Sequence, residues 1–230
     1  MTISASQNYI SEELTHFVGA KLNDDNSRYH LLLEILRSGC LSNSKENAVL
    51  PSGMTQLEIN ESAKLSENEM YIPQMVCFCD IPIDQLSIHV SKYGKFGIGF
   101  SKDFIVRNGG IPVHYIPKEA PESTSISKGQ FYDTKAVDFM NYWQNSKGNM
   151  KEVMTEIHTF LAYNVFAYVK FFDHFLPDDD PGNYYFEREW RILGNLEFTD
   201  ANVKRVFVPR EFEKRFQKDC PHYCDRIYLL

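Results

Sequence analysis

The hydrophobic and polar positions of this chain follow two periods, one typical of strands and one typical of helices. Short apolar or alternating runs predict strands. These runs are residues 12–19, 75–79, 96–100, 111–116, 184–193, 203–208 and 226–230. In the first run Leu14, His16 and Val18 share one face, because successive side chains of a strand point to opposite sides.

Two longer segments have apolar residues at helical spacing. The first covers about residues 28–38, and Gly39 supplies its stop. The second, residues 150–175, is the clearest helix of the chain, and its apolar positions predict one buried face. These positions are Met150, Val153, Met154, Ile157, Phe160, Leu161 and Tyr168. A shorter helix, capped by Asp84 and ending at about Lys92, is predicted after the second strand.

The order of the elements places helices between early and late strands. This order predicts an α+β fold, with a split, mostly antiparallel curved sheet and flanking helices. Residues 42–70 are polar and lack periodicity, so they predict a long irregular excursion, and residues 117–148 give no clear pattern. The chain has 230 residues, 43% of them hydrophobic. It can therefore bury a sizeable core, and we expect a single domain over residues 1–230.

The balance of charge narrows the range of partners. A net charge of −7 argues against a protein that coats nucleic acid along a broad basic face, although it leaves room for a local basic groove. The first residues lack the positive and apolar regions of a secretory signal. Residues 160–176 are the most aromatic stretch, but polar side chains interrupt them too often for a membrane span. We therefore expect a cytoplasmic protein without a membrane partner.

The five cysteines are an odd number in a chain without an export signal, which favours reduced thiols. Cys77 and Cys79 are two residues apart, and Cys220, His222 and Cys224 crowd the C-terminus, so these residues could assemble a zinc site. Because the usual zinc knuckle has the spacing C-x-x-C, small buried thiols are the favoured interpretation. No metal cofactor is expected.

Two carboxylates, Glu187 and Glu189, lie on the strictly alternating run 184–193 and are predicted to project from the same strand face. Together they could engage two hydroxyls of one sugar and stabilise the oxocarbenium-like ion that forms when a glycosidic bond breaks. The alternative is a solvated strand face on which Glu189 pairs with Arg191 or with a lysine of the next strand.

Other side chains are weaker candidates. His16 could hydrogen-bond a ribose or a carboxamide, or it could be a satisfied core histidine. The glycine-rich residues 93–101 allow close approach of the backbone, but their spacing is that of neither a phosphate loop nor a dinucleotide fingerprint, so a plain turn is the alternative. Asp80, His89 and Glu189 could serve a metal-dependent enzyme, although no clean ligand spacing supports this.

Four segments of the chain together resemble a known family. They are LTHFVG, LLLEILRSGCL, MVCFCDIPIDQLSIHVSKYGKFGIGFSKDFIVRNGGIPVHYI and FEREWRIL. This set is similar to the AbiGi family of abortive-infection proteins from bacterial phage-defence loci. The resemblance implies a phage-resistance component, often the antitoxin-like half of a two-gene system, with a toxin or antitoxin protein as its partner.

An early histidine strand, a middle Gly-Phe-Ser strand and a late E-x-E strand also resemble the motif order of ADP-ribosyltransferases, and imply their fold and the use of NAD as a substrate. The resemblance gives His16 a contact with a ribose, makes Tyr93 a stacking partner, and lets Gly99, Phe100 and Ser101 shape the nicotinamide wall. Glu189 would contact the nicotinamide ribose, and Glu187 would orient the acceptor. The middle strand departs from the family because it lacks a full serine-threonine-serine motif.

Three hypotheses follow for the function. The leading one is a phage-defence effector that transfers ADP-ribose from NAD to a nucleic acid or a protein. The second is a non-catalytic antitoxin-like partner that neutralises a co-encoded toxin, which the acidic balance of the chain favours. The third is a nucleic-acid-processing enzyme.

Overall fold

The computed structural model describes residues 11–42, 55–119, 126–177, 180 and 183–230. The chain divides into two compact units. Unit 1 comprises Met1–Lys45, Met75–Ile111 and Glu187–Leu230, and unit 2 comprises Glu46–Gln74 and Pro112–Phe186. This division does not test the expectation of a single domain over residues 1–230, which stays a prediction.

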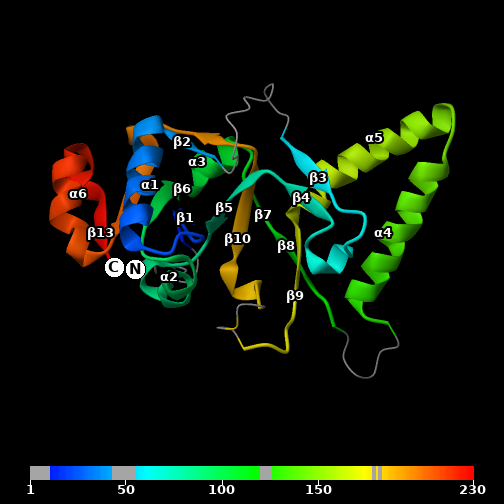
Figure 1. The fold of residues 1–230 in the computed structure, drawn as a ribbon, viewed down its shortest axis with the longest axis horizontal. Helices are drawn as coiled ribbons and strands as arrows, with labels where there is room; N and C mark the ends of the chain where they lie inside the picture. Colours follow the sequence, from blue (N-terminus) through cyan, green and yellow to red (C-terminus); the bar gives the residue numbers. More distant parts are fainter. Residues whose placement is uncertain (1–10, 43–54, 120–125, 178–179, 181–182) are drawn as a thin grey trace, which may run out of the picture. The chain divides into compact units, whose positions relative to one another are not determined.

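Unit 1 is built on a seven-stranded sheet with the order β13-β12-β6-β1-β5-β10-β7 (Figure 1). Its strands are β1 Glu13–Phe17, β5 Met75–Cys79, β6 Gly97–Ser101, β7 Ile111–Pro112, β10 Glu189–Leu193, β12 Val203–Val208 and β13 Ile227–Leu229. The pairs β12–β6, β6–β1, β1–β5 and β5–β10 are antiparallel, and β12–β13 is parallel. The predicted α+β class with a mostly antiparallel sheet is therefore confirmed.

Helices and a small strand pair complete unit 1. They are α1 Asp25–Ser38, α2 Ser87–Tyr93, α3 Lys102–Arg107, α6 Glu213–Asp219, the 3-10 helices Ile83–Gln85, Asp200–Asn202, Arg210–Phe212 and Pro221–Arg226, and the strands β2 Cys40–Leu41 and β11 Leu196–Glu197. Helix α1 buries Leu32 and Leu36 in the same apolar cluster as Leu14, Ile98 and Val206 of the sheet. The core of unit 1 thus forms where a helical stripe meets the apolar side chains of strands.

Both ends of α1 follow from local chemistry. Gly39 takes the left-handed conformation with φ of 64° and ends the helix, as predicted. The helix begins at Asp25, because the carboxylate of Asp24 accepts a hydrogen bond of 2.9 Å from the backbone N–H of Ser27. This is a standard N-terminal cap, which satisfies an N–H group that has no partner within the helix.

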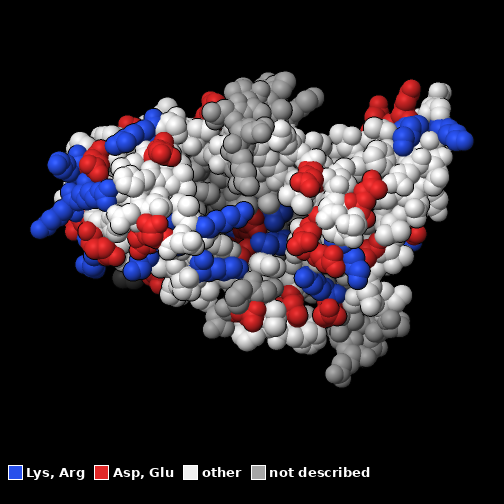
Figure 2. All heavy atoms as spheres, viewed as in Figure 1, with Lys and Arg blue, Asp and Glu red and all other residues white. Residues whose placement is uncertain are grey.

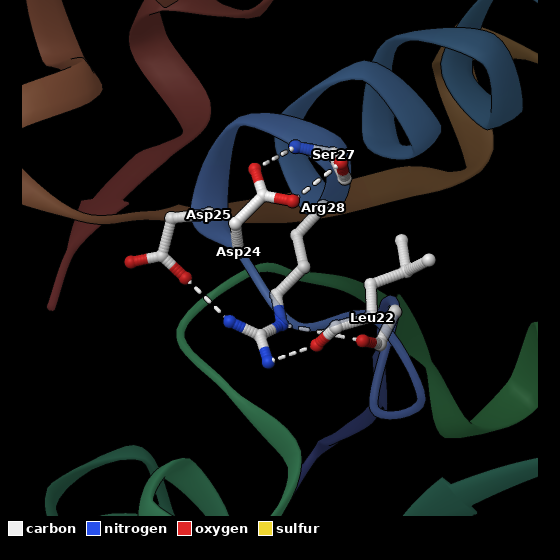
Figure 3. A network of polar contacts seen from close by, with 6 residues as sticks. Leu22, Asp24, Asp25, Ser27 and Arg28 are labelled. Atoms are coloured by element: carbon white, nitrogen blue, oxygen red, sulfur yellow. Dashed lines mark hydrogen bonds and ion pairs between the residues drawn. The ribbon is translucent and has the colours of Figure 1, made fainter.

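Arg28 holds the connection between β1 and α1 (Figure 3). Its Nε donates to the carbonyl of Gly19 over 3.2 Å, its Nη2 donates to the carbonyl of Leu22, and its Nη1 lies 2.7 Å from Asp25. Gly19 has a φ of +76°, and a Cβ there would lie 2.9 Å from Cγ of Arg28. Glycine is therefore required at this turn both by its conformation and by the space that Arg28 takes.

Unit 2 consists of two small strand pairs and two long helices. Its elements are β3 Leu57–Ile59, β4 Tyr71–Pro73, β8 His114–Pro117, β9 Val169–Phe172, α4 Lys128–Asn145, α5 Asn149–Asn164 and the 3-10 helices Leu65–Glu67 and Phe166–Tyr168. The pair β3–β4 is antiparallel and the pair β8–β9 is parallel. Helices α4 and α5 meet at the short connection between them (Figure 1). Their small residues Ala136 and Ala162 share an apolar cluster with Tyr71 and Phe171.

Several predicted boundaries were wrong. The helix predicted over 150–175 ends at Asn164, and the chain then forms the strand β9. Helix α4 lies in the segment that gave no clear pattern. Asp84 is part of the 3-10 turn Ile83–Gln85, and Leu86, not Asp84, is the N-cap residue of α2. The helix α3 occupies most of the connection between β6 and β7, where no helix was predicted.

The predicted buried face of α5 was also wrong. Of its seven residues, Met150, Val153, Ile157 and Phe160 are exposed, and Met154, Leu161 and Tyr168 are half-buried. The buried residues of the helix are His158 and Ala162. The buried side is held by specific contacts: the ring of His158 stacks on that of Trp143 with centroids 4.2 Å apart, and its Nε2 lies 3.1 Å from the hydroxyl of Tyr71. Aromatic stacking and hydrogen bonding at one side chain have therefore decided which side of the helix faces the core.

Within the described ranges, no helix is both long and apolar enough to cross a membrane.

We expect the stability of unit 2 to fall in mild acid because of His158. Burial is the main cause that lowers the pKa of His158 below its ordinary value of 6.5. The unfolded chain therefore takes up a proton at higher pH than the folded chain, so the stabilisation is complete above pH 6.5 and is lost as the pH falls below it. Urea denaturation at pH 7.5 and pH 5.5 measures this loss.

The variant His158→Gln tests the assignment. It should be less stable than the wild type at pH 7.5, and its stability should depend less on pH between 7.5 and 5.5. The variant His114→Gln is the matched control, because His114 is exposed in unit 2 and meets solvent in both states; it should keep the pH dependence of the wild type. An unchanged pH dependence in His158→Gln would contradict the role of this histidine.

Candidate functional site

The start of β10 differs from the regular strand that the alternating sequence predicts. Residues Tyr185–Glu187 form a 3-10 turn, and β10 begins only at Glu189. Between them Arg188 has a φ of 43°, a left-handed conformation that is uncommon for a residue with a side chain. The backbone carbonyl of Arg188 accepts a hydrogen bond of 3.1 Å from Asp80. Glu187 and Glu189 therefore do not share one face of a continuous strand, and this prediction was wrong.

Glu187 is nevertheless buried in unit 1, with 4% of its surface exposed. Its carboxylate lies 2.8 Å from Nζ of Lys92 and accepts a hydrogen bond from the hydroxyl of Tyr93. Both partners come from the last turn of α2. A buried carboxylate loses its hydration, so it needs a cation and hydrogen-bond donors close by. The end of α2 supplies both to Glu187.

Glu189 is buried as well, and its partner lies on its own strand. Arg191 donates to it from Nε over 2.8 Å and from Nη2 over 3.3 Å, and both side chains are buried. The two residues share a face of β10 because they are two positions apart. The alternative in which Glu189 pairs with Arg191 is therefore confirmed, although the face is buried and not solvated.

Asp80 directly follows β5 and is a third buried carboxylate of this region. Its Oδ2 lies 2.8 Å from Nζ of Lys102 and 3.9 Å from Nη2 of Arg188. Its Oδ1 has no hydrogen-bond partner among the described residues. Figure 2 shows lysine and arginine atoms beside acidic atoms over the part of unit 1 that holds α2, β5 and β10. This region is a charge cluster with cations and carboxylates in contact.

His16 lies on β1 and is tied to the neighbouring strand. Its Nδ1 is 2.8 Å from the backbone carbonyl of Cys77, and a carbonyl can only accept, so Nδ1 carries the proton. Burial lowers the pKa of His16, against the opposing effect of the Cys77 carbonyl. The ring is therefore neutral at pH 7, with Nε2 as an acceptor. Its ring packs against the ring of Phe78 with centroids 5.9 Å apart. The register pairs the neighbouring Thr15 with Cys79, and Cys79 with Glu189, so the side chain of His16 lies on the opposite face of the sheet from Glu189.

Both glutamates affect the pKa of Tyr93. Burial, followed by the charge of Glu187 and then its hydrogen bond, raises the pKa of Tyr93 above its ordinary value, and Glu189 adds to the rise. The ring of Tyr93 stacks on Phe17 with centroids 6.4 Å apart, and the ring of His89 lies 6.0 Å away. Tyr93 is therefore a protonated hydroxyl held within an aromatic group, and its ring faces are in contact with protein.

The three residues of the Gly-Phe-Ser segment hold positions in the sheet. Phe100 is fully buried in the core of unit 1. The hydroxyl of Ser101 accepts from the backbone N–H of Phe104 over 3.2 Å and caps α3. A Cβ at Gly99 would lie 3.2 Å from the carboxylate of Glu13, which pairs with Arg205 at 3.1 Å. The structure thus brings Tyr93, Glu187 and Glu189 together, leaves His16 on the other face of the sheet, and gives the Gly-Phe-Ser residues structural contacts. The assignment of these residues to NAD binding stays a prediction.

No metal centre emerges from the part of the chain that the structure describes. Within it, no group of three or more histidine, cysteine, aspartate or glutamate side chains is arranged to hold a metal ion. The combination of Asp80, His89 and Glu189 with a metal is not observed, since Asp80 and Glu189 bind cationic side chains instead. All five cysteines lie in described residues, and none forms a disulfide. Burial raises the pKa of Cys79 to about 12, which keeps this thiol protonated and disfavours it as a zinc ligand.

Sequence reasoning missed the cations of the cluster. Lys92, Lys102 and Arg188 were not singled out, although Lys92 stands directly beside Tyr93 in the chain. The signal that could have found them is physical: if two carboxylates of an alternating strand are buried, cations must lie within a few ångströms of them. Which cations these are depends on contacts up to 95 residues apart, as for Lys92 and Glu187.

Comparison with known proteins now adds the family. A model of the family described as "Putative abortive phage resistance protein AbiGi, antitoxin" matches residues 55–220. This match covers most of the chain. The chain belongs to the AbiGi family. The match includes β5, α2, β6 and β10, and thus most of the charge cluster.

One curated AbiGi relative is similar to part of this chain. It is the "Abortive phage resistance protein AbiGi" of Lactococcus lactis subsp. cremoris, which is 29% identical over 170 residues, or 64% of this chain. The chain spans about 60% of the length of this relative. No solved structure matches the chain.

The Lys92–Glu187 contact should contribute strongly to the stability of unit 1. Lys92→Met removes the cation that lies 2.8 Å from a buried carboxylate. We expect a loss of about 3 kcal/mol in the free energy of unfolding, the lower end of the range for a buried pair, because the lysine side chain is partly exposed. Denaturant titration followed by tryptophan fluorescence measures this loss. In the background Glu187→Gln, the same lysine substitution should cost less, because the charge that needs compensation is gone.

Lys95→Met is the matched control, since Lys95 is exposed a short distance along the same segment. Its effect should stay within about 0.5 kcal/mol of the wild type. Equal losses for the two lysine variants would show that the contact with Glu187 is not what stabilises the cluster.

Proposed function

We propose that this chain is the antitoxin-like component of a phage-defence system and neutralises a partner toxin by direct protein contact. One observation carries the proposal: Glu187 and Glu189, the two side chains best suited to catalysis, are buried and bound to Lys92, Tyr93 and Arg191. A carboxylate that stabilises a positively charged sugar has to touch that sugar, which would require giving up a buried ion pair. The cluster therefore supports a structural role for both.

Two further observations support a partner protein. The family model that matches residues 55–220 carries the word antitoxin in its description. The net charge of −7 suits contact with a basic protein, because complementary charges speed association and suppress wrong partners. A toxin that acts on nucleic acid would present such a basic surface.

The proposal is tested by expression in bacteria with and without the protein encoded beside this chain in its phage-defence locus. Expression of this chain alone should leave growth unchanged. Expression of the neighbouring protein alone should arrest growth, and co-expression of both should restore it. The two proteins should also elute together in size-exclusion chromatography. Growth arrest by this chain alone, or failure to restore growth at equal expression, would refute the proposal.

A second candidate function is an ADP-ribosyltransferase-like enzyme that uses NAD. The observation in its favour is that Tyr93, Glu187 and Glu189 lie close together in unit 1, next to the sheet that also contains His16 and the Gly-Phe-Ser strand β6. In this candidate the sheet would have an ADP-ribosyltransferase-like arrangement. Glu189 would leave Arg191 to contact the nicotinamide ribose, Glu187 would orient a nucleic-acid or protein acceptor, and His16 would accept a hydrogen bond at Nε2.

Incubation of the purified chain with labelled NAD and a cell lysate separates the two candidates. The antitoxin-like function predicts no labelled macromolecule. The enzyme predicts a label that is sensitive to either nuclease or protease and that disappears in Glu189→Gln. Glu197→Gln is the control, because Glu197 is exposed on β11 and its loss should leave any labelling intact. Circular dichroism of both variants confirms that they are folded.

A further inference from the structure

Helix α5 presents a stripe of large apolar side chains to solvent. Met150, Val153, Ile157 and Phe160 recur at the three-to-four spacing of one helix face, and their exposed fractions are 59%, 49%, 42% and 60%. We call these four residues the α5 stripe. Exposed apolar residues scattered singly are ordinary, but a contiguous set along one helix typically marks an interaction site.

The α5 stripe is fixed in its outward position. On the other side of the helix, the hydroxyl of Thr155 accepts from Nε1 of Trp143 over 3.0 Å, and Nζ of Lys151 donates to the carbonyl of Trp143 over 2.7 Å. The stack of His158 on the same ring and the hydrogen bond from Tyr163 to the carbonyl of Thr55 add to this. Rotation of α5 to bury the stripe would break these contacts.

The charge beside the stripe is acidic. Helix α5 contains three residues charged at neutral pH, Lys151, Glu152 and Glu156. The two glutamates are four positions apart and therefore lie one turn from each other on the same side of the helix, next to Phe160. Lys151 is turned away, with its Nζ over the ring of Trp143 at 4.5 Å. An apolar stripe with an acidic border suits a partner whose apolar side chains are bordered by lysine or arginine.

A second copy of this chain suits the stripe poorly. If two α5 helices packed antiparallel about a two-fold axis at Ile157, Glu156 would face Glu156 of the other copy, and like charges at that position disfavour pairing. In a parallel pair Glu156 would face the apolar Leu161. In neither arrangement does α5 offer a cation to its own glutamates.

We infer that the α5 stripe is the docking site for an amphipathic helix of the toxin, one with apolar residues at three-to-four spacing and a basic border. The identity of the partner rests on the proposed antitoxin-like function, while the site itself rests on the exposed side chains and the acidic border. Helix-to-helix docking of this kind uses anchors at i, i+4 and i+7. Val153, Ile157 and Phe160 provide such anchors on this chain, with Glu156 beside them for register.

The test compares two matched double variants. Val153→Lys with Phe160→Lys places two cations in the stripe, where they replace apolar contact and oppose a basic partner. Phe131→Lys with Val137→Lys makes the same exchanges on α4, where these residues are 50% and 57% exposed. The probe is the purified protein encoded beside this chain in its locus, with binding measured by isothermal titration calorimetry and folding checked by denaturation.

We expect the stripe variant to bind the probe at least tenfold more weakly than the wild type and the α4 variant to bind within twofold of it. Glu152→Gln with Glu156→Gln should weaken binding and reduce its dependence on salt. Unchanged affinity in the stripe variant would overturn the inference and leave the proposed function standing. A wild-type chain that does not bind the probe would overturn both. A wild-type dimer that the stripe variant converts to a monomer would show that a second copy covers the stripe, and would also overturn the inference.

Discussion

The need to compensate buried charge shapes the central part of unit 1. Asp80, Glu187 and Glu189 are all buried, and burying a carboxylate is costly unless cations and hydrogen-bond donors replace its hydration. This requirement places the end of α2 against Glu187, so that Lys92 and Tyr93 reach it. The left-handed Arg188 resets the chain between the two glutamates. The contacts of α2 with the segment before β10 thus provide the compensation that Glu187 needs.

Specific polar and aromatic contacts also explain why the apolar face of α5 is exposed. Its apolar pattern is regular enough to predict a buried face, yet His158 is buried instead, stacked on Trp143. Thr155 and Lys151 also bind Trp143. Specific hydrogen bonds and aromatic stacking outweigh the general preference for burial at this helix. Contacts on the buried side of α5 thus keep its apolar stripe exposed, as a docking surface would need.

The sequence predicted what depends on local signals. The end of α1 at Gly39 and the strands β5, β12 and β13 follow from caps, periodicity and apolar runs, and the structure confirms them. Helix α4 was missed because its buried positions include Gly129 and Ala136, which give little periodic signal. In the site, the pairing of Glu189 with Arg191 follows from their spacing. The contact of Glu187 with Lys92 depends on tertiary packing, and no local pattern contains it.

The charge cluster of unit 1 and the α5 stripe of unit 2 differ in how readily they could bind another molecule. In the charge cluster, Glu187 and Glu189 already have close partners, so a ligand would have to compete with ion pairs formed in a buried setting, where such pairs are costly to break. Met150, Val153, Ile157 and Phe160 of the α5 stripe are exposed, so no ion pair of the described residues has to break there, and release of water from apolar side chains favours association. Binding a partner at the α5 stripe therefore costs less free energy than binding a substrate at the charge cluster. This difference is the physical reason for preferring an antitoxin-like role.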